Sequence, residues 1–293
     1  MEWPTDWSLL GTLVATGLLY WRGSRRPSLR ALPPGQRRRR AERLWQPLTF
    51  YAALATILVA LASLDRLSEQ LFSVHMVQHM LLMLVAAPLL VLAAPWTALW
   101  RPFPLAFRRA VAGTVTRSRV CAPLRGLAHW IALPIPAWLL FNVDIGVWHV
   151  PAAYDLTVRN PTVHYLEHLS FIGFGILFWA QLIDSPPFRA RLDYFGRSLY
   201  AAAGAAATWI LAVVLAIAPT PLYSAYAELA HRPGGLSALT DQQLAAGAMW
   251  GPGSIPYGIL VFWALYRWLG PEDAPARRRR RGSRRVPAGQ SSV

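Results

Sequence analysis

The side chains with the clearest potential for chemistry are four histidines in two pairs, His75 with His79 and His164 with His168. Residues four positions apart lie on one face of an α-helix, about one turn apart, so each pair can face a common point. Each pair lies near one end of a long apolar segment, where ionisable side chains are costly and usually functional. Neutral imidazole binds copper, zinc and iron. If both pairs lie on one side of a membrane, they predict a metal or haem site.

Two neighbouring side chains strengthen the expectation of a metal site. Met83 continues the stripe of His75 and His79 one turn further along the helix, and a thioether suits Cu(I). Glu167 lies beside the second histidine pair. Buried histidine ligands normally donate their second N–H to an acceptor. The carboxylates expected on the same side of the membrane are Asp144, Asp155, Glu167 and Asp241.

Simpler explanations of these residues remain open. A single histidine at a membrane interface is usually an interfacial polar residue, and the methionines within residues 76–83 more often pack in a core than bind copper. The stretch from His164 to His168 also matches H-x-x-E-H, the inverted zinc-protease motif, with Glu167 as the base. That motif needs a third ligand and a catalytic cleft, and the sequence offers no clear candidate for either.

Composition places the chain in a membrane. It has 293 residues, of which 55% are hydrophobic and only 15% charged, and it contains 14 Trp. Soluble domains do not have this composition. The net charge of +15 comes from arginine alone, because the chain has no lysine. These arginines lie between the apolar segments, so the positive-inside rule explains them better than nucleic-acid binding does.

The apolar segments predict an all-α, polytopic membrane protein with seven transmembrane helices. About 20 apolar residues span a bilayer, and seven stretches approach this length. The first follows acidic rather than basic residues, so we interpret it as a retained span and not as a signal peptide. We expect residues 1–270 to form the membrane domain and the Arg-rich residues 271–293 to form a disordered cytoplasmic tail. The seven predicted spans are residues 3–21, 47–64, 74–94, 127–147, 163–183, 199–219 and 244–269.

Arginine placement predicts the orientation of these spans. The connections on one side of the membrane carry 26 arginines, and those on the other side carry 3. Because cytoplasmic connections are enriched in arginine, the N-terminus is expected outside and the C-terminus in the cytoplasm. Six of the seven histidines then lie on the outer side, and only His129 lies on the cytoplasmic side. This orientation places both histidine pairs at one membrane face.

Three further features lie on the predicted outer side. His149 follows the fourth span in an aromatic loop that ends at Pro151, and this loop could cap the site. Asp241 precedes the seventh span, so its carboxylate could reach the same cavity. Trp250 belongs to residues 249–253, a Gly- and Pro-rich interruption of the seventh span. Such breaks are tolerated where the backbone is buried in protein or lines a cavity, although a simple packing kink explains this one equally well.

Several of these motifs together resemble the seven-span CtaG family of cytochrome c oxidase assembly factors. Gly251 departs from the family pattern, in which a larger apolar residue is expected, so the seventh helix is expected to be looser there. The segments that carry the resemblance follow one another over about residues 45–270: residues 75–80 with Pro88 and Pro95, Trp148 and His149 with Pro151, residues 164–179, residues 241–243, and residues 249–253.

The resemblance implies a bacterial plasma-membrane protein, not an enzyme, that supports maturation of a haem–copper oxidase by handling copper at the outer face. Its partners would be an oxidase subunit and a copper donor protein. A similarly named single-span chaperone uses a cysteine pair, but Cys121 is the sole cysteine here, so that mechanism does not carry over. The residues that the resemblance marks are His75, His79, His149, His164 and His168, with Asp241 and Trp250 as lesser candidates.

Three alternatives to copper handling follow from the same residues. Histidines from the third and fifth spans could be axial ligands of a haem in a membrane redox protein. A metal permease is a second alternative, but it needs ligands along its whole path, and polar residues thin out toward the cytoplasmic half. The third is a zinc-dependent hydrolase that uses Glu167 as its base.

Overall fold

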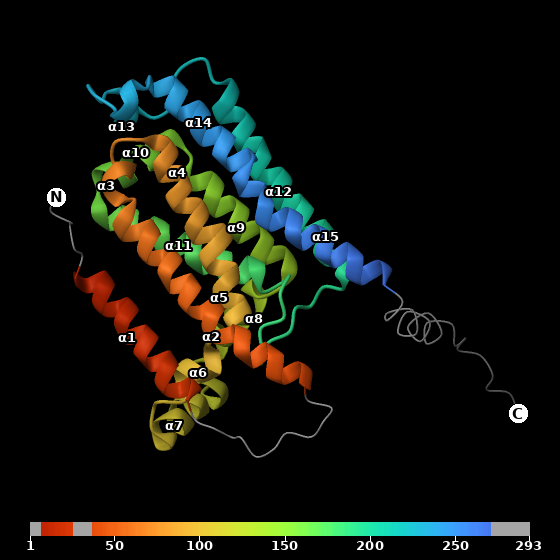
Figure 1. Cartoon of the computed structure of the whole chain (residues 1–293). Helices are drawn as coiled ribbons and strands as arrows, with labels where there is room; N and C mark the ends of the chain where they lie inside the picture. Colours follow the sequence, from red (N-terminus) through yellow and green to blue (C-terminus); the bar gives the residue numbers. More distant parts are fainter. Residues whose placement is uncertain (1–6, 26–36, 271–293) are drawn as a thin grey trace, which may run out of the picture.

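The described part of the chain is a bundle of α-helices (Figure 1). The computed structural model describes residues 7–25 and 37–270. No β-strand occurs within these two ranges, so the all-α prediction is confirmed for them. The helices are α1 Trp7–Ser24, α2 Arg37–Leu58, α3 Asp65–Ser68, α4 Phe72–Met80, α5 Ala87–Ala93, α6 Trp96–Trp100, α7 Leu105–Arg117, α8 Ala122–Ile131, α9 Pro134–Trp148, α10 Pro151–Arg159, α11 Pro161–Trp179, α12 Tyr194–Ile217, α13 Ser224–Ala227, α14 Ala238–Trp250 and α15 Ile255–Leu269.

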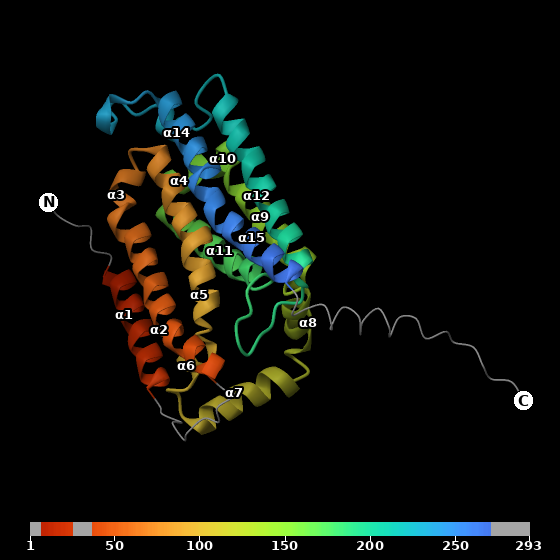
Figure 2. The same cartoon turned by 45° about the vertical axis from the view of Figure 1, so that its right-hand side comes forward.

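A long rod formed by α4, the π-helix η3 (Leu81–Ala86) and α5 lies at the centre of the bundle. The helices α2 and α11 pack against this rod, and α14 packs against its α4 end. A second π-helix, η2 (Val59–Ser63), extends α2, and α12 lies along α14 and α15 (Figure 2). The short helices α3, α10 and α13 gather at one end of the bundle (Figure 1). This end is called the α3/α10/α13 end below.

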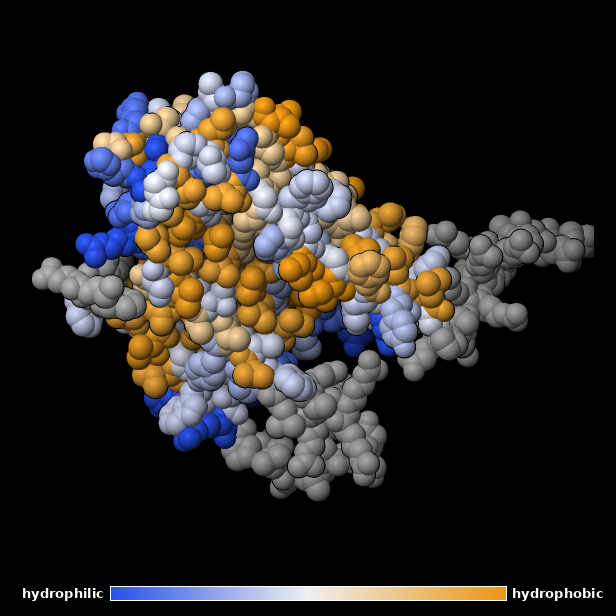
Figure 3. All heavy atoms as spheres, turned by 45° about the horizontal axis from the view of Figure 1, so that its top comes forward, coloured by the Kyte–Doolittle hydropathy of each residue, from blue (hydrophilic) through white to orange (hydrophobic). Residues whose placement is uncertain are grey.

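Three helical stretches in the part that the structure describes are long and apolar enough to cross a membrane: Trp45–Ser63, Phe72–Ala93 and Tyr194–Ile217. The pair α8 and α9 makes a fourth if it is counted as one span. Hydrophobic residues cover much of the middle of the face in Figure 3, and hydrophilic ones gather toward its ends. Outward side chains such as Ile210 and Phe262 are 69% and 75% exposed, as expected for lipid-facing positions.

The sequence predicts seven spans and an N-terminus on the outer side. The three or four candidate spans among the described residues do not test this number or the orientation, so both stay predictions. Two predicted spans are not continuous helices. The stretch 127–147 is bent by 78° between α8 and α9, where Pro134 starts the new helix. The stretch 244–269 breaks at Gly251 between α14 and α15, inside the interruption that the sequence indicates. The predicted tail at 271–293 and the first residues of the stretch 3–21 lie outside the described residues.

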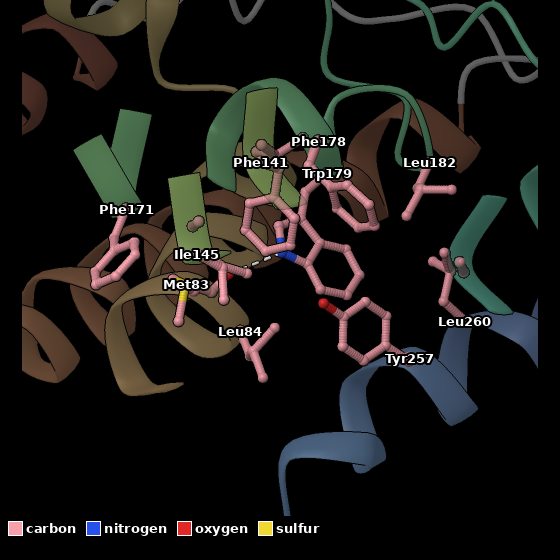
Figure 4. Packing of buried hydrophobic residues seen from close by; sticks show 13 residues of the cluster. Met83, Leu84, Phe141, Ile145, Phe171, Phe178, Trp179, Leu182, Tyr257 and Leu260 are labelled. Atoms are coloured by element: carbon pink, nitrogen blue, oxygen red, sulfur yellow. Dashed lines mark hydrogen bonds between the residues drawn. The ribbon is translucent and has the colours of Figure 1, made fainter. Parts of the chain in front are cut away.

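A buried hydrogen bond joins the rod to α11. The Nε1–H of Trp179 donates to the backbone carbonyl of Met83 at 2.8 Å, inside η3 (Figure 4). Tyr257 of α15 stacks on the same indole, with ring centroids 5.6 Å apart. Buried carbonyls need a partner, so this bond satisfies a group in the irregular part of the rod. Phe171 and Phe178 complete this apolar cluster.

Close packing of α11 on the rod depends on Gly175. A Cβ atom at this position would lie 3.0 Å from the Cβ of Ala87 and 3.5 Å from the carbonyl oxygen of Met83. The first distance is shorter than most Cβ contacts, so a side chain at this position would have to push α11 and the rod slightly apart. Near this contact the histidines of α11 reach those of α4, with ring centroids 5.0 Å apart for His75 and His164.

We expect Gly175→Val to destabilise the protein by about 1–3 kcal/mol, because the added methyl groups force α11 away from the rod. Gly173→Val is the matched control on the same helix, since nothing lies within 4 Å of a Cβ built at Gly173. Thermal unfolding of both variants in detergent measures the difference. Equal loss of stability in the two variants would contradict this account of the packing.

Candidate metal centre

The two histidine pairs meet in the interior of the bundle. His75 and His79 come from α4, and His164, Glu167 and His168 come from α11. Each of the five residues offers one nitrogen or oxygen atom, and these atoms all lie within 4.8 Å of one another. We call these five residues the histidine cluster. A geometry this compact matches the first coordination shell of a single metal ion after a small contraction.

Ring contacts join the pairs across the two helices. The ring centroids of His75 and His164 are 5.0 Å apart, and those of His79 and His168 are 5.3 Å apart. Within α4, the Nε2 atoms of His75 and His79 are 2.8 Å apart. The nearest oxygen of Glu167 is 3.6 Å from the Nε2 of His79. The four imidazole rings and the carboxylate of Glu167 therefore surround one small volume.

Tyr226 fixes the tautomer of His75. The hydroxyl of Tyr226 donates to the backbone carbonyl of Ser68 at 2.5 Å, so it accepts from the Nδ1–H of His75 at 2.8 Å. Burial raises the pKa of Tyr226, so its hydroxyl keeps the proton that this arrangement needs. The lone pair of neutral His75 then lies on Nε2, which faces the cluster. Metal-binding histidines are commonly oriented by this kind of outer partner.

The cluster leaves polar atoms buried without protein partners. The Nε2 atoms of His164 and His168 and both carboxylate oxygens of Glu167 have no hydrogen-bond partner among the described residues. Glu167 is fully buried, and His168 is 4% exposed. Burying unpaired polar groups costs about 1–3 kcal/mol each, and more when the group is charged. A bound cation would satisfy all four atoms at once, so the donor set fits a metal ion.

The start of α4 is fixed by a carboxylate from a distant helix. Asp241 of α14 is fully buried and accepts from the backbone N–H groups of Phe72 at 2.7 Å and Ser73 at 3.1 Å. These are among the first N–H groups of α4, which have no partner inside their own helix. Its negative charge also suits the positive end of the helix. Asp241 thus sets the position of the helix that carries His75.

The end of α11 that carries its histidines is set locally. The side chain of Asn160 accepts from the N–H groups of Thr162 and Val163, and Pro161 occupies the first turn. Both features are typical of helix starts. His164 therefore stands in the first turn of α11, and His168 follows one turn later on the same face.

A cavity of about 940 Å³ leads to the histidine cluster from the α3/α10/α13 end. Its lining includes His75, His164 and His168 of the cluster, together with Asp65 and Glu69. Partial burial and the nearby charge of Asp65 raise the pKa of Glu69. A path for a cation from this end of the bundle to the cluster is therefore present.

The predicted ligand His149 and the lesser candidate Met83 have other close neighbours. His149 is buried, with its Nδ1 at 2.7 Å from the carbonyl of Ile145 and its Nε2 at 3.2 Å from the sulfur of Met76. Met83 packs in the apolar cluster with Phe171 and Trp179. The π-helix after Met80 changes the phase of the rod, so Met83 does not simply continue the stripe of the histidines.

The remaining candidates have partners or positions of their own. Asp144 accepts from the Nε1–H of Trp148 and the hydroxyl of Ser170, each at 3.0 Å. Asp155 accepts from the hydroxyl of Ser224 and the N–H of Ala225. Trp250 is 61% exposed at the end of α14. Metal binding by the cluster, and any contribution of these residues to it, stays a prediction.

Sequence reasoning missed Tyr226, Asp65 and Glu69. Tyr226 lies 151 positions from His75, and no local motif links the two. The acidic pair follows the second predicted span and could have been noted as the acidic part of an outer loop. Its place at the cavity depends on how α1, α3 and α11 pack, which no local pattern predicts.

Comparison with known proteins identifies relatives of the whole bundle. The family model described as cytochrome c oxidase caa3 assembly factor (Caa3_CtaG) matches residues 12–270. Two uncharacterized proteins, from Mycobacterium bovis and Mycobacterium tuberculosis, are each 25% identical over 214 residues. The match covers 71% of this chain and 31% of each relative, so the chain spans about a third of their length. No solved structure matches the chain.

We expect Asp241→Ala to lower the free energy of unfolding by about 1–3 kcal/mol, because two buried N–H groups of α4 lose their charged acceptor. The matched control is Asp193→Ala, which removes an exposed cap that accepts only from Gly196 and should cost about 1 kcal/mol. Thermal unfolding in detergent compares them. A smaller loss for Asp241→Ala than for Asp193→Ala would show that Asp241 does not hold α4.

Proposed function

The chain belongs to the cytochrome c oxidase caa3 assembly factor family, and we propose that it holds a copper ion at His75, His79, His164 and His168 and passes it to an oxidase subunit. Membership of this family implies association with cytochrome c oxidase during its assembly. The copper step is the part that the family name does not supply. It rests on the chemistry of the histidine cluster.

One observation carries the proposal: Glu167 is fully buried among four imidazoles, and neither of its oxygens has a hydrogen-bond partner among the described residues. A carboxylate is costly in such a place unless a cation compensates it. Neutral imidazoles cannot supply that charge, but they can bind the ion that does. Four nitrogens and one oxygen are a donor set typical of copper, zinc and iron. The resemblance to assembly factors of haem–copper oxidases favours copper among these.

In this proposal each residue has a defined part. The four histidines bind copper through their ring nitrogens, and Glu167 offsets its charge. Tyr226 keeps the Nε2 lone pair of His75 facing the ion. No bond to a substrate is made or broken, so the protein acts as a holder and not as a catalyst.

Entry and release would use the cavity at the α3/α10/α13 end. Asp65 and Glu69 line it, and carboxylates raise the local concentration of cations. We place this end at the outer face of a bacterial plasma membrane, with the C-terminus in the cytoplasm, because the arginines predict that orientation. A copper donor protein and the recipient oxidase subunit would then approach from the same side.

The geometry favours a single ion over the alternatives. A haem needs a flat macrocycle between opposed ligands, whereas the rings of His75 and His164 are already in contact across the helices. A permease needs a polar path through the membrane. Here the ring of Phe171 contacts His79, and Phe171 belongs to the apolar cluster that also contains Trp179. A catalytic zinc keeps an open position, whereas five protein atoms converge here.

We expect His79→Ala or His168→Ala to weaken copper binding by at least about 10- to 100-fold, the usual cost of losing even an outer partner of a metal site. Oxidase activity should fall in cells while the abundance of the protein stays near normal. His231→Ala is the control, because His231 is exposed and lies in a loop. Normal oxidase activity in both cluster variants would contradict the proposal.

Glu167→Gln separates holding from hydrolysis. This change removes the carboxylate charge but keeps the shape of the side chain. We expect the variant to retain copper more weakly, and we expect the same hydrolysis rate as in the wild type. Copper content after dialysis and hydrolysis of a casein substrate by the zinc-loaded protein are the two measurements. A variant that keeps its metal but loses hydrolysis shown by the wild type would instead support the hydrolase alternative.

A further inference from the structure

A second pair of potential ligands lies beside the histidine cluster. The Nε2 of His149 and the Sδ of Met76 are 3.2 Å apart, and the two residues are 7% and 1% exposed. His149 directly follows the last residue of α9, and Met76 follows His75 on α4. Because one residue turns an α-helix by about 100°, Met76 faces a different direction from His75.

The hydrogen bonds of His149 determine where its lone pair lies. Its Nδ1 is 2.7 Å from the carbonyl oxygen of Ile145, which only accepts, so Nδ1 carries the proton. A doubly protonated, charged ring is costly in this buried place. The Nε2 of the neutral ring therefore has no proton to donate to Met76. Two electron-pair donors, a nitrogen and a thioether sulfur, face each other.

The backbone around His149 is fixed by its neighbours. The hydroxyl of Tyr223 donates to the carbonyl of His149 at 3.2 Å. The ring of Tyr154 is close to both sites, with its centroid 6.1 Å from that of His149 and 5.1 Å from that of His75. The pair is thus adjacent to the histidine cluster.

We propose that His149 and Met76 form a second metal site, selective for Cu(I). Imidazole together with a thioether suits this soft ion, whereas zinc and Cu(II) favour harder donors. Metal–nitrogen and metal–sulfur bonds of about 2.0 and 2.3 Å can bridge atoms 3.2 Å apart. A monovalent ion is also less costly than a divalent one in a site without a carboxylate. This site binds whether or not the histidine cluster holds copper.

Anaerobic Cu(I) binding, measured with a competing chromophoric chelator and by X-ray absorption at the copper edge, tests this site. We expect the wild-type protein to bind Cu(I) that has a sulfur neighbour. The Met76→Leu variant should bind one Cu(I) fewer and should show no sulfur scattering. The change from Met to Leu conserves volume, so the fold should persist. Met249→Leu is the matched control, since Met249 is buried in the same apolar cluster as Met76.

A variant with Ala at His75, His79, His164 and His168 separates this site from the proposed function. It should keep one Cu(I) with a sulfur neighbour, and addition of Met76→Leu should remove it. If the histidine cluster binds no copper, the wild type still shows this single sulfur-bound ion. Wild-type protein whose bound Cu(I) has no sulfur neighbour, or Met76→Leu that retains the wild-type stoichiometry and sulfur scattering, would overturn the proposal.

Discussion

The burial of Glu167 among four histidines, inside an otherwise apolar bundle, is the constraint on which the rest of the account depends. A carboxylate and several imidazoles without partners are unfavourable there, and a cation removes this cost for all of them together. A stable protein that keeps a buried carboxylate of this kind needs a bound cation to compensate its charge. The cavity toward Asp65 and Glu69 gives that ligand a route in.

The surrounding structure holds two helices at the separation that the cluster requires. Gly175 lets α11 approach the rod, and Trp179 satisfies the carbonyl of Met83 where the rod turns into a π-helix. Asp241 fixes the start of α4 from another helix. These contacts involve no ligand atom, yet each sets the distance between the histidine pairs. Metal sites need this kind of support because ligand geometry tolerates errors of only a few tenths of an ångström.

The helical class and the pairing of the histidines could be predicted from the sequence, because both follow from local spacing and apolar segment length. The spacing of four puts His164 and His168 on one face, and the two pairs do meet. The partners of the site could not be predicted, since Tyr226 and Asp241 reach α4 only through the tertiary fold. Nor could the π-helix η3 that contains Met83, because its hydrogen bonding leaves no local sequence pattern. The separation of His149 from the cluster depends in the same way on how α9 ends against α4.

The most direct test of the central claim is the copper content of the purified full-length protein after loading with Cu(II) and removal of excess metal. We expect one Cu(II) per chain in the wild type and none in the variant with Ala at His75, His79, His164 and His168, because the proposed site at His149 and Met76 is selective for Cu(I). Both proteins must show the same helical circular dichroism, so that the comparison concerns folded chains. A folded wild type without Cu(II), or a variant that retains Cu(II), would contradict a copper site at the histidine cluster.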